Sequence, residues 1–591
     1  MTSSRIAIVL ITLIVGSVRA ESCKCSPQDP CWPMASDWDT LNRTLDGGLI
    51  QFNPPGSVCY SSQPDYNQEA CDSLIAQYST WAFNSANPAS MDTKDACDPI
   101  YPNGTSIFGD TQAGAIGCSL GALSPYVVNA TKAGHVRAAL QFAEDHNLRL
   151  NIKNTGHGGK LRSSAPGSLS IWTHHMKSFV FHETFQPVGC SFNTSKHDAQ
   201  MAATIGAGMQ DGELFEALAS HNAFGTGGTN TDVGVVGWST GGGHGFMTGA
   251  YGQGADNIIE ASVVTPAGDV VVANECQHED LFWAIRGGGG GTFGDILNLT
   301  LKAYPMPNVT LFGINIAAKN GTSPKTWWEF IAGFHTLVPA LQDQGLHGYW
   351  SMGAASRALG GSFFLWNADN ATVAQVTAPL QELLKNSSDL ITYTASPIQL
   401  PTFYELVKQL PALGDMSRNG ATTASRLISR DVLTQNQTAF AKTLEKLAQN
   451  NVESLTQGSI SFSGTMTISS KPVDNSLNPV WRRASIHLIA SQSYPATLSS
   501  IETEKVVRDM TFNKLNLLRE LDPSSGAYLN EANDLEPGWQ WSFFGQNYGR
   551  LFTLKNKYDP NGLLWCNKCV GSEQWVMVQN GSLCPAYAFH Q

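Results

Sequence analysis

Charged residues are scarce in this chain of 591 residues, and basic residues are scarcer than acidic ones. Only 14% of the residues are Asp, Glu, Lys or Arg, and 36 basic residues stand against 48 acidic ones, for a formal net charge of −12. A nucleic-acid-binding protein needs a basic surface, so this class is excluded. With 42% hydrophobic residues the chain is too apolar to be disordered. It is also longer than the roughly 250–300 residues at which a single core stops growing, so at least two domains are expected.

Long apolar runs are missing after the first twenty residues. A membrane-spanning helix needs about 20 apolar residues, and the run over residues 6–15 is too short. That run follows Arg5, and Val18 and Ala20 suit the −3 and −1 positions of a signal-peptidase site. Residues 1–20 are therefore predicted to be a signal peptide, and the protein is expected to be secreted, extracellular and not bound to a membrane.

Sequons and cysteines agree with secretion. Seven of the twelve cysteines precede residue 120 and three, Cys566, Cys569 and Cys584, lie near the C-terminus, which predicts disulfides that hold the two ends together. The Cys566-x-x-Cys569 pair leaves a redox-active pair and half of a zinc site open as alternatives. N-linked glycans are predicted at some of eleven N-x-S/T sequons. These are Asn42, Asn103, Asn129, Asn193, Asn298, Asn308, Asn320, Asn370, Asn386, Asn436 and Asn580.

Residue patterns divide the chain. Residues 21–120 are rich in Cys, Pro, Gly and Asn and lack periodicity, which predicts an irregular, disulfide-braced segment. A helical pattern from residue 135 is then followed by a strand pattern, and residues 257–273 read as a hairpin. From about residue 309, strands alternate with long helices, which indicates a sheet covered by helices and an α+β fold class. The later strands are predicted near residues 311–317, 347–355, 360–368, 459–469 and 484–491.

Glycine is the most unusual residue by its placement. Four clusters, NTGHGG, GTGG, GWSTGGGHG and RGGGGG, begin at residues 154, 225, 237 and 286. Glycine is needed where backbone approaches a ligand closely, and N–H groups in such loops can bind phosphates. Neither a G-x-G-x-x-G between a first strand and helix nor a P-loop is present. We therefore expect a large phosphate-bearing cofactor in a non-Rossmann fold; flexible surface loops are the simpler alternative.

The motifs KNTGHGG, GVVGWSTGGGHGFMTGAYGQGADNI, DLFWAIRGGGGGTFGD and QNYGRLFTLKNKYDPNGLLW resemble those of the FAD-linked oxidases of the vanillyl alcohol oxidase superfamily. The chain is more similar to berberine-bridge-enzyme-like flavoproteins, and the CKCSPQDPCWP and GSEQW segments resemble secreted fungal isoamyl alcohol oxidases. The resemblance implies a PCMH-type FAD-binding domain and a substrate domain of an antiparallel sheet covered by helices. The implied units are a Cys-rich segment packed on the FAD domain (21–120), the FAD-binding domain (121–308), the substrate-binding domain (309–523) and a C-terminal return to the FAD domain (524–591).

The same resemblance implies which residues bind FAD. His157 matches the histidine that bonds covalently to the flavin 8α-methyl group. Some relatives add a cysteinyl bond, but the matching position here is Asn230, so a single 8α-histidyl linkage is expected. Val233 matches a position near flavin C4a where a small residue admits dioxygen, which favours an oxidase over a dehydrogenase. The implied FAD-binding residues are His157, Lys153, Asn154, Thr155, Gly156, Gly158, Val233, Gly234, Gly237, Gly241, Gly242, His244, Asn257 and Asn547.

Hydride transfer from an alcohol needs a base for the hydroxyl proton, and histidine suits this near neutral pH. His244 occupies the place of an active-site tyrosine in plant relatives, and His487 lies on a predicted strand where relatives carry Glu or Gln. A packed or structural histidine is the alternative for each. Glu531, in GAYLNEAN, replaces a tyrosine of the related motif, and Asn547 and Tyr548 match residues near the flavin or substrate. The catalytic candidates are thus His487, His244, Glu531 and Tyr548, and no metal is expected.

These features predict a secreted, monomeric FAD-dependent oxidase that acts on a small-molecule alcohol, uses dioxygen and produces hydrogen peroxide. A carbohydrate (oligosaccharide) oxidase and a secondary-metabolite oxidative cyclase on the same scaffold are the alternatives. A glycoprotein whose glycine loops bind a structural ligand, or nothing, is the non-enzymatic alternative.

Overall fold

The computed structural model describes residues 23–89, 96–158, 162–190, 199–409, 420–578 and 581–589. The predicted signal peptide and two sequons, Asn193 and Asn580, lie outside these ranges. Over the described residues, no helix combines the length and apolar character that a membrane span requires.

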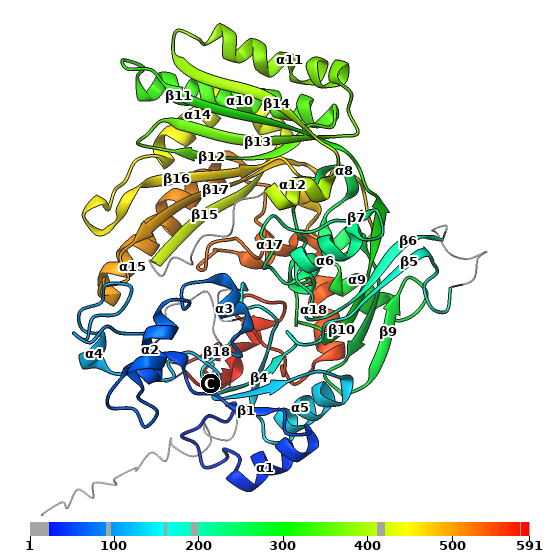
Figure 1. The fold of residues 1–591 in the computed structure, drawn as a ribbon, viewed down its shortest axis with the longest axis vertical. Helices are drawn as coiled ribbons and strands as arrows, with labels where there is room; N and C mark the ends of the chain where they lie inside the picture. Colours follow the sequence, from blue (N-terminus) through cyan, green and yellow to red (C-terminus); the bar gives the residue numbers. More distant parts are fainter. Residues whose placement is uncertain are drawn as a thin grey trace, which may run out of the picture.

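The N-terminal part is irregular, as its composition predicts. It contains the short elements α1 (Ala35–Thr44), β1 (Leu49–Gln51), α2 (Gln68–Ile75), α3 (Trp81–Ala86) and α4 (Ala113–Ile116). The Cys59–Cys71 and Cys97–Cys118 disulfides brace it around a small core that includes Tyr60 and Tyr78. In Figure 1, α3 lies nearer to the centre of the molecule than α2 and α4 do.

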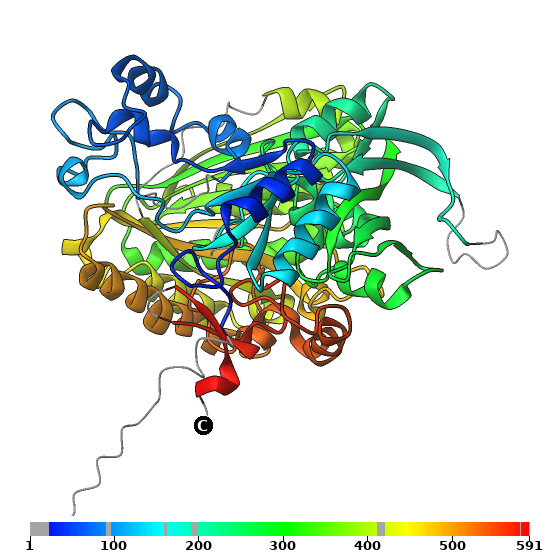
Figure 2. The same cartoon turned by 90° about the horizontal axis from the view of Figure 1, so that it is seen from below.

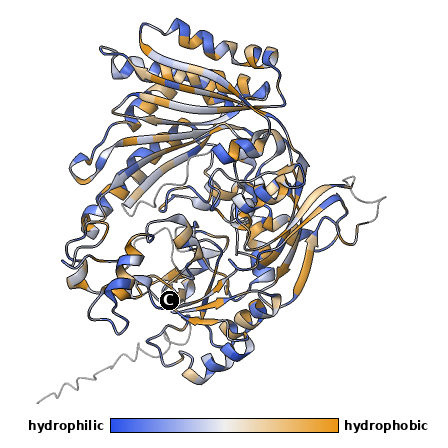
Figure 3. Cartoon of the chain, viewed as in Figure 1, coloured by the Kyte–Doolittle hydropathy of each residue, from blue (hydrophilic) through white to orange (hydrophobic). Residues whose placement is uncertain are grey.

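Two sheets follow in the first half of the chain. A four-stranded sheet has the order β1-β2-β4-β3, in which β2, β3 and β4 are parallel and α5 provides the crossover. A six-stranded sheet has the order β5-β6-β10-β8-β9, with β7 paired to β10, and its strands are largely orange in Figure 3. The predicted helix, strand and hairpin are confirmed as α5, β3 and β8–β9. The bounds are β2 (Tyr126–Asn129), α5 (Ala133–Asp145), β3 (Arg149–Lys153), β4 (Ser168–Trp172), β5 (Phe179–Phe185), β6 (Gln200–Gly206), α6 (Asp211–Ala219), β7 (Ala223–Gly225), α7 (Val235–Thr240), α8 (Thr248–Tyr251), β8 (Ile258–Val264), β9 (Val270–Asn274), α9 (Glu279–Ile285) and β10 (Asp295–Pro305).

An antiparallel seven-stranded sheet occupies the second half, in the order β14-β11-β13-β12-β16-β17-β15. Helices α10, α11, α14 and α16 cover one face of this sheet (Figure 1), and Trp327, Phe334, Phe363 and Phe462 pack in the core between them. The five predicted strands are confirmed. The bounds are β11 (Val309–Ala318), α10 (Pro324–Asp343), β12 (His347–Gly353), β13 (Ala358–Trp366), α11 (Asn370–Asn386), β14 (Ile391–Leu400), α12 (Phe403–Gln409), β15 (Gly420–Ser429), α13 (Arg430–Gln435), α14 (Gln437–Leu447), β16 (Gln457–Thr465), β17 (Ala484–Tyr494), α15 (Ser500–Arg508) and α16 (Leu515–Leu521).

The C-terminal segment returns to the start of the chain. After α17 (Trp539–Phe544) and α18 (Tyr548–Tyr558), strands β18 (Trp575–Met577) and β19 (Leu583–Pro585) form a small hairpin. The Cys23–Cys584 disulfide joins the two ends, and the Lys24 N–H donates to the Leu583 carbonyl at 2.7 Å. Figure 2 shows these red strands beside the dark blue start of the chain.

All twelve cysteines pair in the structure, so the prediction of disulfides is confirmed. Cys25 pairs with Cys31, and Cys190 pairs with Cys276. Cys566 and Cys569 form a disulfide with each other, which disfavours the zinc alternative because neither thiolate is available as a ligand.

Buried histidines make the stability of this fold depend on pH. His335 of α10 is fully buried, its Nδ1–H donates to the Ile331 carbonyl at 2.8 Å, and burial lowers its pKa to about 4. An unfolded histidine has a pKa near 6.5, so the unfolded state binds the proton first as pH falls. This histidine therefore destabilises the fold as pH falls from about 6.5 to 4, by about 3 kcal/mol across the window.

We expect the variant His335→Met to flatten the fall in melting temperature between pH 6.5 and 4, because methionine fills similar volume without titrating. Thermal melts at several pH values measure this slope. The matched control is His221→Gln, which removes an exposed imidazole and should leave the slope unchanged. An unaltered slope in His335→Met would contradict the prediction.

Candidate active site

A cavity of about 380 Å³ lies between the first half of the chain and the C-terminal return. Its wall is formed by residues within 150–173, 207–238 and 290–296 and by residues within 528–531 and 564–566. Three of the four glycine clusters contribute to its wall, and Gly156 and Gly291 adopt positive φ values of 94° and 66° there. The fourth cluster packs instead against Phe215 and Asp211. The main lining residues are Leu150, Ile152, Asn154, Thr155, Gly156, His157, Gly158, Arg162, Asn230, Val233, Gly234, Gly237, Trp238, Gly290, Gly291, Asp295, Ile296, Tyr528, Asn530, Glu531, Leu564, Trp565 and Cys566.

Eight of the residues expected to bind FAD line this cavity. They are Asn154, Thr155, Gly156, His157, Gly158, Val233, Gly234 and Gly237. His157 is held on two sides: its Nε2 lies 2.9 Å from the Asp232 carboxylate, and its ring stacks on Trp81 of α3 with the centroids 4.5 Å apart. The position of the possible cysteinyl bond, Asn230, also faces the cavity.

The other expected FAD-binding residues are not in the wall of this cavity. Lys153 is completely buried, and its Nζ donates to the Asn87 carbonyl at 2.8 Å. Burial lowers the pKa of Lys153 to about 7, and Asp232 partly opposes this shift. The Asn257 side chain donates to the Gln253 carbonyl at 2.9 Å. A Cβ on Gly241 or Gly242 would collide with Asn530 or Leu477, so these glycines permit close packing.

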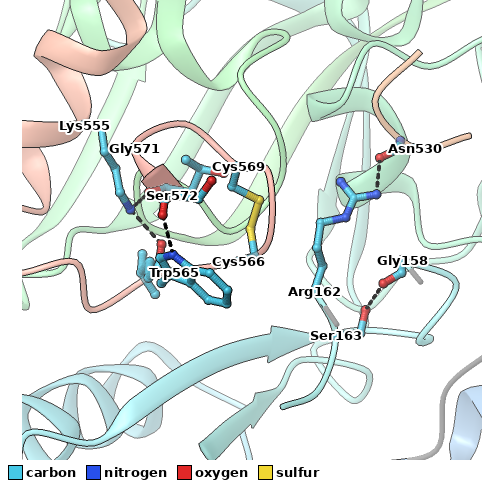
Figure 4. The surroundings of a disulfide bond; sticks show 12 residues. Gly158, Arg162, Ser163, Asn530, Lys555, Trp565, Cys566, Cys569, Gly571 and Ser572 are labelled. Atoms are coloured by element: carbon cyan, nitrogen blue, oxygen red, sulfur yellow. Dashed lines mark hydrogen bonds between the residues drawn. A yellow bond between two sulfur atoms is a disulfide. The ribbon is translucent and has the colours of Figure 1, made fainter. Parts of the chain in front are cut away.

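Two charged residues that the sequence analysis did not single out also line the cavity. The Nη2 of Arg162 donates to Asn530 Oδ1 at 2.9 Å (Figure 4), while its buried Nε has no hydrogen-bond partner. Burial raises the pKa of Asp295 to about 7, and one of its carboxylate oxygens is also without a partner. Buried polar atoms are rarely left unpaired, so both side chains are suited to bind a polar ligand.

Figure 4 also shows the Cys566–Cys569 disulfide, whose Cys566 lines the cavity together with Trp565. This turn is fixed by hydrogen bonds to the chain around it. The Trp565 Nε1–H donates to the Ser572 carbonyl at 3.1 Å, and Lys555 Nζ donates to the Leu564 carbonyl at 2.7 Å. The disulfide therefore belongs to a rigid wall of the cavity.

Three of the catalytic candidates meet beside the cavity. The Glu531 carboxylate lies 3.1 Å from His244 Nε2 and 3.4 Å from His487 Nδ1, and its side chain is 38% exposed. His244 Nδ1 lies 2.9 Å from the Tyr349 hydroxyl on the other side. The rings of His244 and His487 both contact Tyr528, with centroids 5.3 and 6.0 Å apart.

Each member of this His244–His487–Glu531 cluster comes from a different region. His244 follows α7, His487 pairs with Thr465 and Leu427 in the large sheet, and Glu531 lies on the C-terminal return. The loop that carries Glu531 is anchored to β15, because Asn533 donates to the Thr423 carbonyl at 2.6 Å and Glu536 forms a buried ion pair with Arg426 at 2.7 Å.

Burial shifts the pKa values of His487 and of the two tyrosines beside the cluster. It lowers the pKa of His487 to about 4; Glu531 partly opposes this shift, and His244 adds to it. Burial also raises the pKa values of Tyr349 and Tyr528 above the usual range. At neutral pH His487 is therefore uncharged and both tyrosines are protonated.

The structure places the remaining two candidates elsewhere. Asn547 lines a separate surface cavity beside Trp283 and Arg482, and its amide donates to the Leu477 carbonyl at 3.0 Å. The Tyr548 hydroxyl donates to Glu573 and accepts from the Gly571 N–H. Neither residue is in the wall of the glycine-lined cavity.

Comparison with known proteins defines the family. The model described as "FAD binding domain" matches residues 124–274, and the one described as "Berberine and berberine like" matches residues 527–571. An uncharacterized FAD-linked oxidoreductase of Arthroderma benhamiae is 34% identical and covers 94% of each chain. The VAO-type flavoprotein oxidase VAO615 of Thermothelomyces thermophilus is 33% identical and covers 96% of each. The chain therefore belongs to the FAD-linked oxidoreductases of the vanillyl alcohol oxidase (VAO) and berberine-bridge-enzyme-like family.

Solved structures agree with this assignment. The VAO-type flavoprotein MtVAO713 from Myceliophthora thermophila superposes with a TM-score of 0.87 at 27% identity, over 95% of this chain and all of that chain. A glucooligosaccharide oxidase from Acremonium strictum shares the fold with a TM-score of 0.62 at 19% identity, over 76% of this chain and 92% of that one. The Acremonium strictum enzyme carries a 6-S-cysteinyl, 8α-N1-histidyl FAD.

FAD is thus the cofactor of this protein, and the cavity residues suit it. The glycines provide backbone that a large ligand can approach closely. The unpaired Nε of Arg162 suits a phosphate or flavin oxygen, and the unpaired oxygen of Asp295 suits a hydroxyl or amine.

We expect Gly237→Leu to weaken FAD binding. A Cβ at Gly237 would meet no atom within 4 Å, because the residue faces the cavity, so the leucine would occupy space that FAD needs. Overpacking costs about 1–3 kcal/mol, or about 5- to 150-fold in affinity. The ratio of flavin absorbance to protein absorbance measures the loss.

The matched control is Gly134→Leu on α5, an exposed helical glycine whose Cβ would likewise meet no atom within 4 Å. It should retain the full flavin content. Equal flavin content in both variants would show that the cavity is not the FAD site.

Proposed function

We propose that this protein is a secreted oxidase that oxidises a hydroxyl-bearing carbon of a small-molecule substrate and reduces dioxygen to hydrogen peroxide. FAD, when bound, supplies the hydride acceptor at N5 and the electrons for dioxygen. The observation that carries the proposal is the His244–His487–Glu531 cluster, whose Glu531 lines the FAD cavity. Alcohol oxidation requires a base at that place, because the hydroxyl proton must leave as the C–H hydride is transferred.

Glu531 is the base in this proposal, and His244 shares its proton. The carboxylate is the member of the cluster that lines the cavity, so it is the nearest to a substrate stacked on the cofactor. His244 Nε2, 3.1 Å away, can take up or stabilise the proton, and the Tyr349 hydroxyl orients the imidazole from its other nitrogen. His487 is not in the cavity wall, and its Nδ1, 3.4 Å from the Glu531 carboxylate, helps to hold that carboxylate in place.

Dioxygen is proposed as the electron acceptor. Val233 lines the cavity with a small side chain, and this supports access of dioxygen to the flavin. VAO615 of Thermothelomyces thermophilus, which is 33% identical, bears the name of an oxidase.

A single covalent bond from His157 to the flavin is also proposed. His157 lines the cavity, whereas the position of a second, cysteinyl bond is Asn230. The six disulfides use all twelve cysteines, so no thiol is available for such a bond. The histidyl linkage of the Acremonium strictum enzyme supports the same chemistry here.

Secretion is supported by the disulfides and by the positions of the sequons. Six disulfides are typical of proteins that fold in an oxidising compartment. The exposed sequon residues are Asn103, Asn308, Asn320, Asn370, Asn386 and Asn436, where a glycan can be attached without disturbing the core.

An oligosaccharide oxidase is the second candidate. On β12 and β16, Trp350 and Phe462 point into the helix-covered core, so Ser351, Ser461 and Ser463 lie on the opposite, exposed face. The same face carries Tyr349 and His487. A hydroxyl-rich surface leading to the cluster favours a substrate with many hydroxyl groups.

The direct test is a screen of primary alcohols, secondary alcohols and oligosaccharides with detection of hydrogen peroxide. Peroxide formed with oligosaccharides alone would favour the second candidate. Flavin reduction without peroxide in air would overturn the oxidase and indicate a dehydrogenase.

We expect Glu531→Gln to lower the rate of flavin reduction by substrate by about 10²- to 10⁴-fold, because the amide cannot accept the proton. Anaerobic stopped-flow absorbance measures this rate. Flavin content should stay normal. The control is Asp46→Asn, which alters an exposed carboxylate that also contacts a histidine, His135 at 3.3 Å, but lies outside the cavity. An undiminished rate in Glu531→Gln would rule out the carboxylate as the base.

We expect acid precipitation of the native protein to leave the flavin in the pellet, and His157→Ala to release it to the supernatant. A flavin mass on the peptide that contains His157 identifies the bond. Covalent flavin that persists in His157→Ala would place the linkage at another residue.

A further inference from the structure

We propose that Asp232 is a positioning residue for the covalent attachment of FAD to His157, and that helix α3 of the N-terminal segment holds the pair in place. This inference rests on the proposed His157 linkage and assigns a role to residues around it. None of these residues belongs to the His244–His487–Glu531 cluster.

The geometry determines which nitrogen of His157 is free. Asp232 Oδ2 lies 2.9 Å from Nε2, and a carboxylate can only accept, so Nε2 carries the proton. In this neutral tautomer Nδ1 keeps its lone pair. The side chains of His157 and Asp232 are 16% and 12% exposed, so little water competes for the hydrogen bond.

The Asp232 carboxylate is itself held by other groups. Gln210 Nε2 donates to Oδ1 at 2.8 Å, and the Ser85 hydroxyl donates to Oδ2. The Asp232 N–H donates to the Asn230 side chain at 2.9 Å, which fixes the backbone. A carboxylate restrained by these bonds presents a fixed acceptor to the imidazole, as residues behind metal-bound histidines do.

Helix α3 contacts both members of the pair. Trp81, at its start, stacks on the His157 ring with an interplanar angle of 8°, and Ser85 binds Asp232. Lys153, the last residue of β3, donates to the carbonyls of Ser85 and Asn87 at 3.4 and 2.8 Å. The disulfide-braced segment is thereby bound to the strand that leads into the His157 loop.

In the covalent attachment, the His157 imidazole and the flavin 8α-methyl group each lose one bond to hydrogen and share one new bond. His157 Nδ1 forms a bond to the flavin 8α-carbon, and one C–H bond of that methyl group breaks. The imidazole, now bonded at Nδ1, gives up its Nε2 proton, and Asp232 stabilises the positive charge that develops before the proton leaves. The two electrons of the broken C–H bond, with the methyl proton and the Nε2 proton, reduce the flavin ring. Dioxygen then reoxidises the ring with formation of hydrogen peroxide.

The test is the rate at which Asp232→Asn becomes covalently flavinylated. The native protein and the variant are both prepared free of flavin and incubated with added FAD, and the flavin that stays with acid-precipitated protein is followed by in-gel fluorescence and peptide mass. We expect a rate about 10- to 100-fold below that of the native protein, as for other residues that orient a histidine. Ser85→Ala, which leaves the carboxylate in place, should slow attachment less.

Two comparisons separate this role from a structural one. FAD affinity is measured in His157→Ala and in His157→Ala combined with Asp232→Asn, where no attachment can occur; the two affinities should agree. If Asp232→Asn and Ser85→Ala are flavinylated at the native rate while His157→Ala is not, the role of Asp232 is overturned and the linkage stands. If His157→Ala still becomes flavinylated, the proposed linkage itself fails.

Discussion

A cavity for a large cofactor can persist inside a folded chain only where the surrounding backbone carries few side chains. Protein interiors are otherwise packed to the density of organic crystals. The chain meets this constraint with glycine at the points of closest approach, among them Gly156, Gly237 and Gly291. Because two of these glycines also adopt positive φ values, a side chain there would be strained as well as obstructive. Residues from the first half of the chain and from the C-terminal return surround this space.

The residues proposed for catalysis come from segments that are far apart in the chain. Glu531 is separated from His244 by 287 residues, yet a hydrogen bond joins them. The C-terminal return makes this possible, since Asn533 and the Glu536–Arg426 ion pair attach it to β15. The N-terminal segment also contacts this site, since Trp81 stacks on His157 and the Ser85 hydroxyl donates to Asp232. Both chain ends thus contribute to one site, and the Cys23–Cys584 disulfide joins them.

Strands and helices with a strong apolar period were predictable from the sequence, as β11, β12, β13, β16 and β17 show. Strands β14 and β15 were missed, and their sequences explain why. ITYTASPIQL and GATTASRLIS are rich in Thr and Ser and have few of the large apolar residues that marked the other strands, and both strands lie at the edges of the sheet. Arg162, Asp232 and Asp295 carried no signal in the sequence, because a single charged residue in a loop is ordinarily exposed.

The sequence by itself indicated the glycine loops, the disulfides that the twelve cysteines form, and the candidates His157, His244, His487 and Glu531. The loops and cysteines follow from residue type and local spacing, and the four candidates follow from the resemblance of their motifs to a known family. Only the tertiary structure decided that His244 and His487 share the Glu531 carboxylate, that Asn547 and Tyr548 lie outside the cavity, and that Asp232 faces His157. Distances between residues hundreds of positions apart are set by how sheets pack and where the chain returns, and no local pattern encodes them.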